Sequence, residues 1–98
     1  MADSTQQLIS RIREHSPHLQ EQFGVRQLRL FGSWARGAAG MASDVDVLVA
    51  FEGPASAKRF YGLQFFLEDL LGCSVDLVSE KALREELRPA VEADAITI

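Results

Sequence analysis

The sequence is poor in cysteine and in long hydrophobic runs, and each shortage excludes a class of protein. Its single cysteine, Cys73, rules out a disulfide within the chain and a zinc site built on several cysteines, which fits a reducing compartment. The longest unbroken apolar runs, such as VLVAF, are far too short to cross a bilayer. The polar start, MADSTQQ, has no signal-peptide core. We therefore expect a cytoplasmic protein without a membrane-spanning segment.

Basic residues are also scarce. The chain has 10 Lys and Arg against 14 Asp and Glu, a formal net charge of -4 and a pI near 5.0. This balance argues against broad electrostatic binding of nucleic acid. The 98 residues suffice for one hydrophobic core and not for a second lobe, so we expect a single domain over residues 1–98. With 47% hydrophobic and 24% charged residues, the chain has the composition of a folded domain.

The first half of the chain carries helix-start signals and strand-like runs. Ser4 followed by Gln7 has the pattern of a capping box, and Ser16 followed by Pro17 marks the start of a second helical piece. Runs rich in β-branched and apolar residues, bounded by turn residues, are typical of strands. Such runs predict three strands, at residues 25–31, 44–51 and 73–79.

The second half adds two predicted helices. One is long, over residues 55–71, and the other lies within residues 80–98, broken at Pro89 and followed by a short helical or extended tail. Helices and strands then alternate along the whole chain. This order indicates an α/β fold, a small mixed sheet covered by helices.

Two carboxylates interrupt the strand that the sequence predicts most strongly. Side chains alternate between the faces of a strand, so Asp44 and Asp46 share one face while Val45 lies on the other. Asp76 repeats this arrangement on the third strand, and three carboxylates converge if the two strands are neighbours. Carboxylates in close contact repel and raise one another's pKa unless a cation lies between them. Oxygen ligands without nearby His or Cys favour Mg²⁺, with Mn²⁺ as the alternative.

A glycine-serine turn precedes this strand. Gly32 allows close backbone approach, and the short helix expected after it, with Ser33 as N-cap and Gly37 as its end, presents free N–H groups to an anion. Arg36 lies one turn further along, within reach of a phosphate oxygen or of the carboxylates. Other roles stay open for these residues. Ser33 could be a helix cap alone, Arg36 could form a structural ion pair, and the aspartates could form a solvated acidic face. Trp34 could serve in packing or in base stacking.

Together these residues resemble a known signature. Gly32-Ser33, ten intervening residues, Asp44-Val45-Asp46 and a later third carboxylate, Asp76, resemble the motif of the DNA polymerase beta-like nucleotidyltransferase superfamily. The wider string LFGSWARG…SDVDVLVAF…VDLVSEKAL is similar to the minimal nucleotidyltransferase (MNT) antitoxins encoded beside HEPN-domain toxins. The resemblance covers the chain from about residue 25 to its C-terminal end.

The resemblance implies a reaction and a partner. It implies that Asp44 and Asp46 hold two Mg²⁺ ions and that Asp76 helps to hold the one beside the acceptor, while Gly32, Ser33 and Arg36 bind the nucleotide. The expected activity is Mg²⁺-dependent transfer of AMP from ATP to a partner HEPN toxin. A second hypothesis is a binding module: an antitoxin or adaptor that keeps the fold, with or without nucleotide binding, but neutralises its partner by contact alone. Intact Gly32, Ser33 and carboxylates favour the enzyme.

The long predicted helix carries one more functional signal. Its core-facing stripe is formed by Phe60, Leu63, Phe66, Leu67, Leu70 and Leu71. Tyr61 and Phe65 lie four residues apart on the opposite side, beside Lys58 and Asp69, where a monomer would place polar residues. We expect these two aromatic residues to be exposed and to contribute to a homo- or hetero-oligomer interface, with surface aromatics of no function as the alternative.

Overall fold

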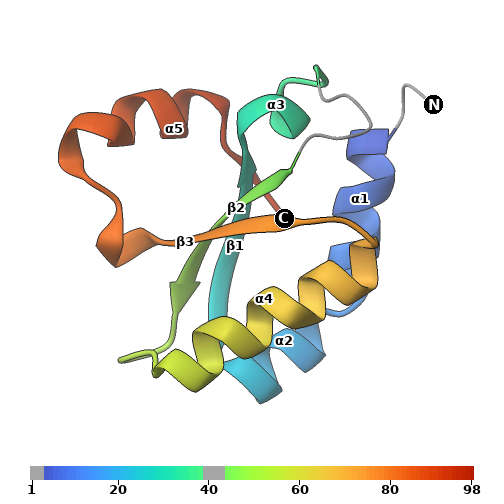
Figure 1. Cartoon of the computed structure of the whole chain (residues 1–98), viewed down its shortest axis with the longest axis vertical. Helices are drawn as coiled ribbons and strands as arrows, with labels where there is room; N and C mark the ends of the chain where they lie inside the picture. The colour runs from blue at the N-terminus through green and yellow to red at the C-terminus, as the bar shows by residue number, and fades with distance from the viewer. Residues whose placement is uncertain (1–3, 39–43) are drawn as a thin grey trace.

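A computed structural model describes residues 4–38 and 44–98 of the chain (Figure 1). Helices and strands alternate in chain order, as the sequence predicts. The helices are α1 (Ser4–Arg13), α2 (Ser16–Phe23), α3 (Gly32–Ala35), α4 (Ala57–Leu71) and α5 (Arg88–Asp94), with 3-10 turns η1 (Glu80–Ala82) and η2 (Glu85–Leu87). The strands are β1 (Val25–Phe31), β2 (Val45–Phe51), β3 (Val75–Ser79) and β4 (Ile96–Thr97).

The strands form one mixed sheet in the order β3-β2-β1-β4. β1 runs antiparallel to both β2 and β4, whereas β2 and β3 are parallel and are joined by α4 (Figure 1). A parallel pair needs a long crossover, and the helix supplies it. The sheet therefore confirms the predicted α/β fold with a small mixed sheet.

One face of the sheet packs on α1, α2 and α4 and forms the hydrophobic core. On α4, Leu63 and Leu67 are fully buried, in the middle of the apolar stripe that the sequence predicts. Ser56 caps this helix by accepting a hydrogen bond from the Arg59 backbone N–H at 3.2 Å. In the described ranges, no helix is long and apolar enough to cross a membrane.

The opposite face of the sheet is apolar along one half and acidic along the other. Leu48 and Ala50 are buried there, but they lie outside the main core cluster. The segment from η1 to α5 lies on this side, with η1 against β2 and α5 against β1. The face that the sequence predicts to be acidic is therefore acidic only near the start of β2 and β3.

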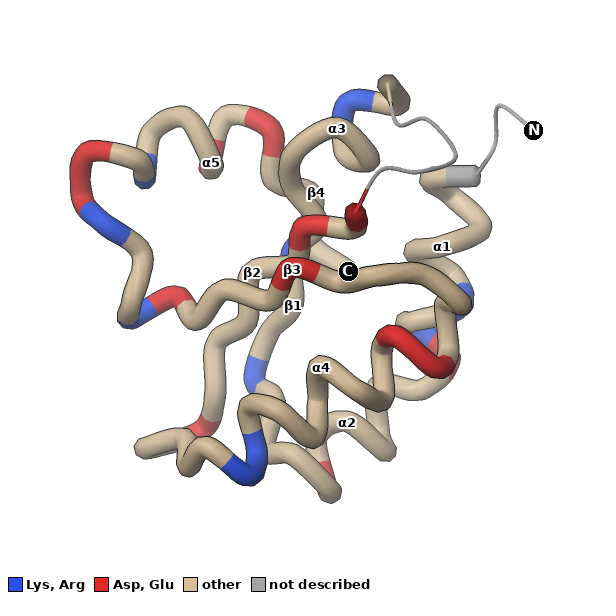
Figure 2. The backbone as a smooth tube through the Cα atoms, viewed as in Figure 1, with Lys and Arg blue, Asp and Glu red and all other residues tan. Residues whose placement is uncertain are grey.

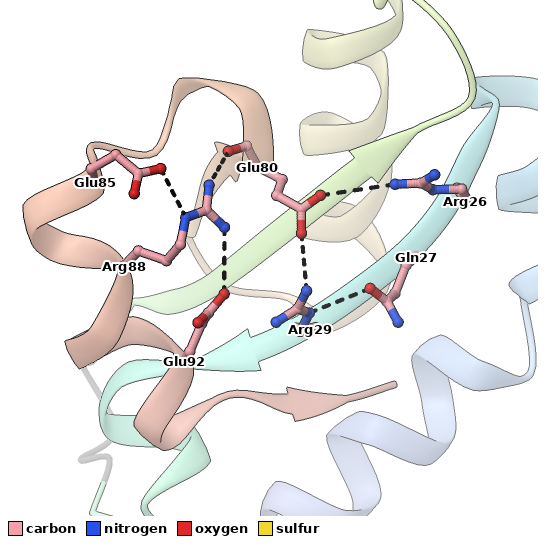
Figure 3. Close-up of polar contacts among 7 residues, drawn as sticks. All are labelled: Arg26, Gln27, Arg29, Glu80, Glu85, Arg88 and Glu92. Carbon is pink, nitrogen blue, oxygen red and sulfur yellow. Dashed lines mark hydrogen bonds and ion pairs between the residues drawn. The ribbon is translucent and has the colours of Figure 1, made fainter.

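Ion pairs fasten the η1 to α5 segment to the sheet (Figure 3). The Arg29 guanidinium of β1 donates to the Glu80 carboxylate at 2.9 Å, and Arg26 lies 3.9 Å from the same carboxylate. Arg88, the first residue of α5, donates to the Glu80 backbone oxygen at 3.3 Å. Glu80 thus connects β1 to the C-terminal helix, and Arg88 has a structural role in this connection.

The C-terminal segment differs from the sequence prediction. Pro89 does not break a helix, because it occupies the first turn of α5, where the missing N–H has no helical partner to lose. The residues before it form 3-10 turns instead of a helix. The tail forms a fourth strand, in which Ile96 pairs with Leu30 of β1, and the Ile98 N–H donates to the Leu28 oxygen at 2.9 Å.

Candidate active site

The parallel register of β2 and β3 places two of the predicted carboxylates side by side. Asp46 is the direct partner of Asp76 across the two strands, and Asp44 lies immediately before β2. Figure 2 shows these acidic positions gathered where β2 and β3 begin, next to α3. Asp44 and Asp76 are exposed and Asp46 is half-buried. The structure therefore brings the three carboxylates together, as expected if the strands are neighbours.

Asp46 is the electrostatic centre of this cluster. Its pKa is raised above the ordinary value of 3.8, first by burial, then by the negative charges of Asp76 and Asp44, and also by a side-chain hydrogen bond with Asp76. The positive charge of Arg36 opposes these effects and lowers the pKa of Asp46. Two carboxylates in hydrogen-bond contact compete for one proton, and a cation between them would remove the conflict.

Gly32 packs directly against the Asp46 carboxylate. The strand pairing of Phe31 with Asp46 delivers Gly32 to this position as the chain leaves β1. Gly32 has a φ of 74°, a left-handed conformation that favours glycine, and a Cβ built on it would collide with Oδ2 of Asp46. Glycine is thus required here both by backbone geometry and by the space that the carboxylate occupies.

The residues after Gly32 form the short helix α3. Ser33 is its second residue and Phe31 takes the N-cap position, so the prediction that Ser33 is the N-cap is wrong. The helix begins one residue earlier than the sequence predicts, at the left-handed turn of Gly32. Gly37, with a φ of 71°, ends the helical turn as predicted. Trp34 packs partly against the core, and its backbone oxygen accepts a hydrogen bond from the Thr5 hydroxyl at 2.7 Å.

Arg36 follows α3 and forms an ion pair that the sequence does not reveal. Its Nη1 donates to Oδ2 of Asp94, the last residue of α5, at 2.7 Å. The two residues are 58 positions apart in the chain. The structural ion pair left open for Arg36 is therefore present, and its charge still acts on Asp46.

The donor set suits a hard divalent cation completed by a substrate. Among the described residues, no group of three or more His, Cys, Asp or Glu side chains is arranged as a ready metal site. Asp46 and Asp76 nevertheless supply adjacent carboxylate oxygens with a raised pKa at Asp46. Mg²⁺ is commonly held by one or two carboxylates together with water and phosphate oxygens, so these residues fit it.

A separate concavity lies at the other end of β2. It encloses about 320 Å³ between Phe51, Pro54, Arg26 and Lys81. None of the predicted site residues lines it. We place the candidate active site at the carboxylates, because grouped acidic side chains with a raised pKa carry chemistry that a mixed apolar pocket does not.

Known proteins resemble this chain over most of its length. The family model described as a nucleotidyltransferase domain matches residues 12–97. The protein adenylyltransferase MntA of Thermococcus cleftensis is 39% identical over 95% of this chain and 94% of its own length. A solved structure of a candidate minimal nucleotidyltransferase is 41% identical, covers 96% of this chain and 95% of its own, and superposes with a TM-score of 0.81.

A more distant solved structure has the same fold. It is that of a tri-AMPylated Shewanella oneidensis HEPN toxin in complex with an MNT antitoxin, at 20% identity and a TM-score of 0.61, covering 99% of this chain and 71% of that one. At this identity the likeness establishes the fold alone. The match of the family model over most of the chain and the similarity to MntA go further, and with them the chain belongs to the nucleotidyltransferase domain family.

Proposed function

We propose that this chain is an Mg²⁺-dependent antitoxin that transfers AMP from ATP to a partner HEPN toxin. Membership of the nucleotidyltransferase family and similarity to a protein adenylyltransferase support the reaction type. The complex of a tri-AMPylated HEPN toxin with an MNT antitoxin supports the choice of partner. We also propose that residues 1–98 act as a single domain, in the cytoplasm where ATP is available.

The observation that carries this proposal is the contact of Gly32 with Asp46, whose direct strand partner is a second carboxylate, Asp76. Asp46 and Asp76 are direct strand partners, and the Gly32 backbone approaches Asp46 so closely that no Cβ fits between them. A phosphate chain held at the Gly32-Ser33 turn would therefore lie beside the carboxylates. Phosphate and carboxylate are both anionic, so this arrangement is stable only with cations between them.

Each residue then has a role in the transfer. The backbone at Gly32, the Ser33 hydroxyl and the Arg36 guanidinium bind and orient the triphosphate. The acceptor hydroxyl oxygen forms a bond to the α-phosphorus while the bond from that phosphorus to the bridging oxygen breaks, and pyrophosphate leaves. We assign the hydroxyl proton to Asp76, because its carboxylate is exposed while Asp46 is half-buried.

The carboxylates would also hold the metal. Asp44, Asp46 and Asp76 are the proposed ligands of two Mg²⁺ ions, with Mn²⁺ as a substitute. When bound, these ions stabilise the negative charge that develops on the leaving pyrophosphate. The chain supplies preorganised positions for this chemistry, since strand pairing fixes Asp46 and Asp76 before any ligand arrives.

The partner is proposed to bind at the exposed face of α4. Tyr61 and Phe65 are 54% and 62% exposed, as the sequence predicts, and the Tyr61 ring meets Phe60 edge to face with centroids 5.3 Å apart. Exposed aromatic side chains are common anchors of protein interfaces. The described residues are nearly all used in the sheet and the helices around it, so a second chain, a toxin or another copy, is expected to complete the acceptor site.

The decisive test is transfer of label to the partner. The purified chain is incubated with its neighbouring gene product, Mg²⁺ and ATP labelled at the α-phosphate, and the partner is analysed by intact mass and autoradiography. Added AMP on the partner, absent when EDTA replaces Mg²⁺ and absent with Asp46→Asn, is the expected result. Tight binding and neutralisation without label would instead identify the chain as a binding module.

A further inference from the structure

The C-terminal helix reaches the candidate active site through one ion pair. Asp94, the last residue of α5, accepts a hydrogen bond from Nη1 of Arg36 at 2.7 Å. The Arg36 side chain is 53% exposed and that of Asp94 is 32% exposed. Arg36 is also the cation whose charge acts on Asp46. The ion pair therefore joins the end of α5 to the residue that follows α3, the short helix that begins at Gly32 beside Asp46.

Both ends of α5 are fixed to the sheet, so Asp94 has a defined position. Arg88 at its start donates to the Glu80 backbone oxygen, and Glu80 is held by Arg29 of β1 (Figure 3). At its other end, β4 begins two residues after Asp94 and pairs with β1, where Ile96 is the partner of Leu30.

The same strand leads directly to Arg36. β1 ends at Phe31, and α3 follows it at once. The chain thus closes a ring: β1 continues into α3 and Arg36, Arg36 binds Asp94, and the strand after Asp94 returns to β1. A long, flexible arginine side chain is restrained by this ring at the edge of the site.

We propose that Asp94 is a positioning residue for nucleotide binding, which holds the Arg36 guanidinium where it meets the triphosphate. This inference rests on the proposed function. The ion pair uses Nη1 of Arg36, and the guanidinium has further N–H donors with which to bind a phosphate oxygen. An aspartate that restrains the guanidinium without using all its donors lowers the entropy lost when ATP binds.

The test compares Asp94→Asn with a matched control on the same helix. Glu92→Gln also removes one negative charge from α5 and one ion pair, its 3.4 Å contact with Arg88, but it does not touch Arg36. Asp94→Asn should raise the KM for ATP roughly two- to fivefold, as expected of a partly exposed pair, with kcat nearly unchanged. Glu92→Gln should leave both constants as in the wild type, and Asp94→Glu should restore part of the affinity.

A double variant shows whether Asp94 acts through Arg36. In an Arg36→Gln background, Asp94→Asn should have no further effect on the affinity for ATP, measured by calorimetry. An equal, additive loss in that background would overturn the proposal, as would tighter ATP binding by Asp94→Asn, which would mean that Asp94 competes with phosphate. A wild-type chain that binds no ATP would overturn the proposed function itself. A wild-type chain that binds ATP, with Asp94→Asn and Glu92→Gln behaving alike, would overturn only the role of Asp94.

Discussion

Replacing Gly32 by alanine tests the contact on which the proposed site depends. The new Cβ would meet Oδ2 of Asp46, so the carboxylate must move or the turn must open. The left-handed φ of 74° adds a cost of its own for any residue with a Cβ. These two effects have different consequences: the first disturbs the carboxylate cluster, while the second lowers stability wherever it occurs.

Gly53 supplies the control that separates them. It has a φ of 68°, it follows the opposite end of β2, and among the described residues nothing lies within 4 Å of the Cβ that Gly53→Ala would add. Both substitutions should lose roughly 1–2 kcal/mol from the left-handed conformation, partly offset by the stiffer unfolded chain. Gly32→Ala should lose about 1 kcal/mol more, the order of cost of an off-rotamer carboxylate.

Activity should separate the two variants much further than stability does. A carboxylate displaced by about 1 Å is expected to lower kcat/KM for transfer of AMP by roughly 100-fold, whereas Gly53→Ala should remain near the wild type. Urea denaturation measures the stability, and labelled ATP measures the transfer. In an Asp46→Ala background the extra destabilisation by Gly32→Ala should disappear, because the Asp46 Cβ itself is at an ordinary 3.4 Å. Equal transfer by the two glycine variants would refute the close contact.

Three further predictions concern the carboxylates, the turn and the exposed aromatics. Because the pKa of Asp46 in the folded state is raised above 3.8, the folded state stays protonated at this residue to a higher pH than the unfolded chain does. The contribution of Asp46 to stability is therefore lost as pH rises from the unfolded pKa through the folded pKa. Asp46→Asn should therefore stabilise the metal-free protein against urea at neutral pH and not at about pH 3, while abolishing transfer; the same gain at both pH values would contradict this. Ser33→Ala should weaken ATP binding more than Mg²⁺ binding in calorimetry, and equal losses would count against a phosphate contact. Tyr61→Ser with Phe65→Ser should weaken the partner complex by roughly 2 kcal/mol or more with the domain still folded, and unchanged affinity and elution volume would make both residues ordinary surface.

Much of the candidate site could be predicted because it follows strand periodicity. Val45 and Val47 are fully buried and Asp46 between them lies on the other face, as the period of two predicts, while Asp44 lies just before the strand. The pairing of Asp46 with Asp76 required one further condition, that β2 and β3 be neighbours. A strand, a helix and a strand in sequence commonly satisfy it, since the helix gives the crossover that a parallel pair needs.

The contacts around the site could not be predicted, because they join residues far apart in the chain. Arg36 meets Asp94 across 58 positions and Arg29 meets Glu80 across 51. Charged residues show the same sequence pattern whether they face solvent or another element of the fold. The pattern therefore cannot identify the residue with which each of them forms an ion pair. The tail was left open between a helical and an extended form for a related reason: the two residues of β4 are too few to show alternation, and only their pairing with β1 defines the strand.

The sheet face that carries Asp46 is acidic at one end and buried at the other, and this limits where a nucleotide can bind. Leu48 and Ala50 follow Asp46 on the same face of β2 and are 2% and 7% exposed, so the acidic surface ends after one pair of residues. If the proposed site is correct, ligands should approach from the edge beside α3, where Gly32 and Arg36 lie, and not along the strand. A single short edge of this kind offers few groups with which to grip an acceptor as well as a nucleotide. We therefore expect selection of the acceptor to come from the partner that presents it, so an interface variant on α4 should lower transfer at limiting partner concentration without changing the affinity for ATP.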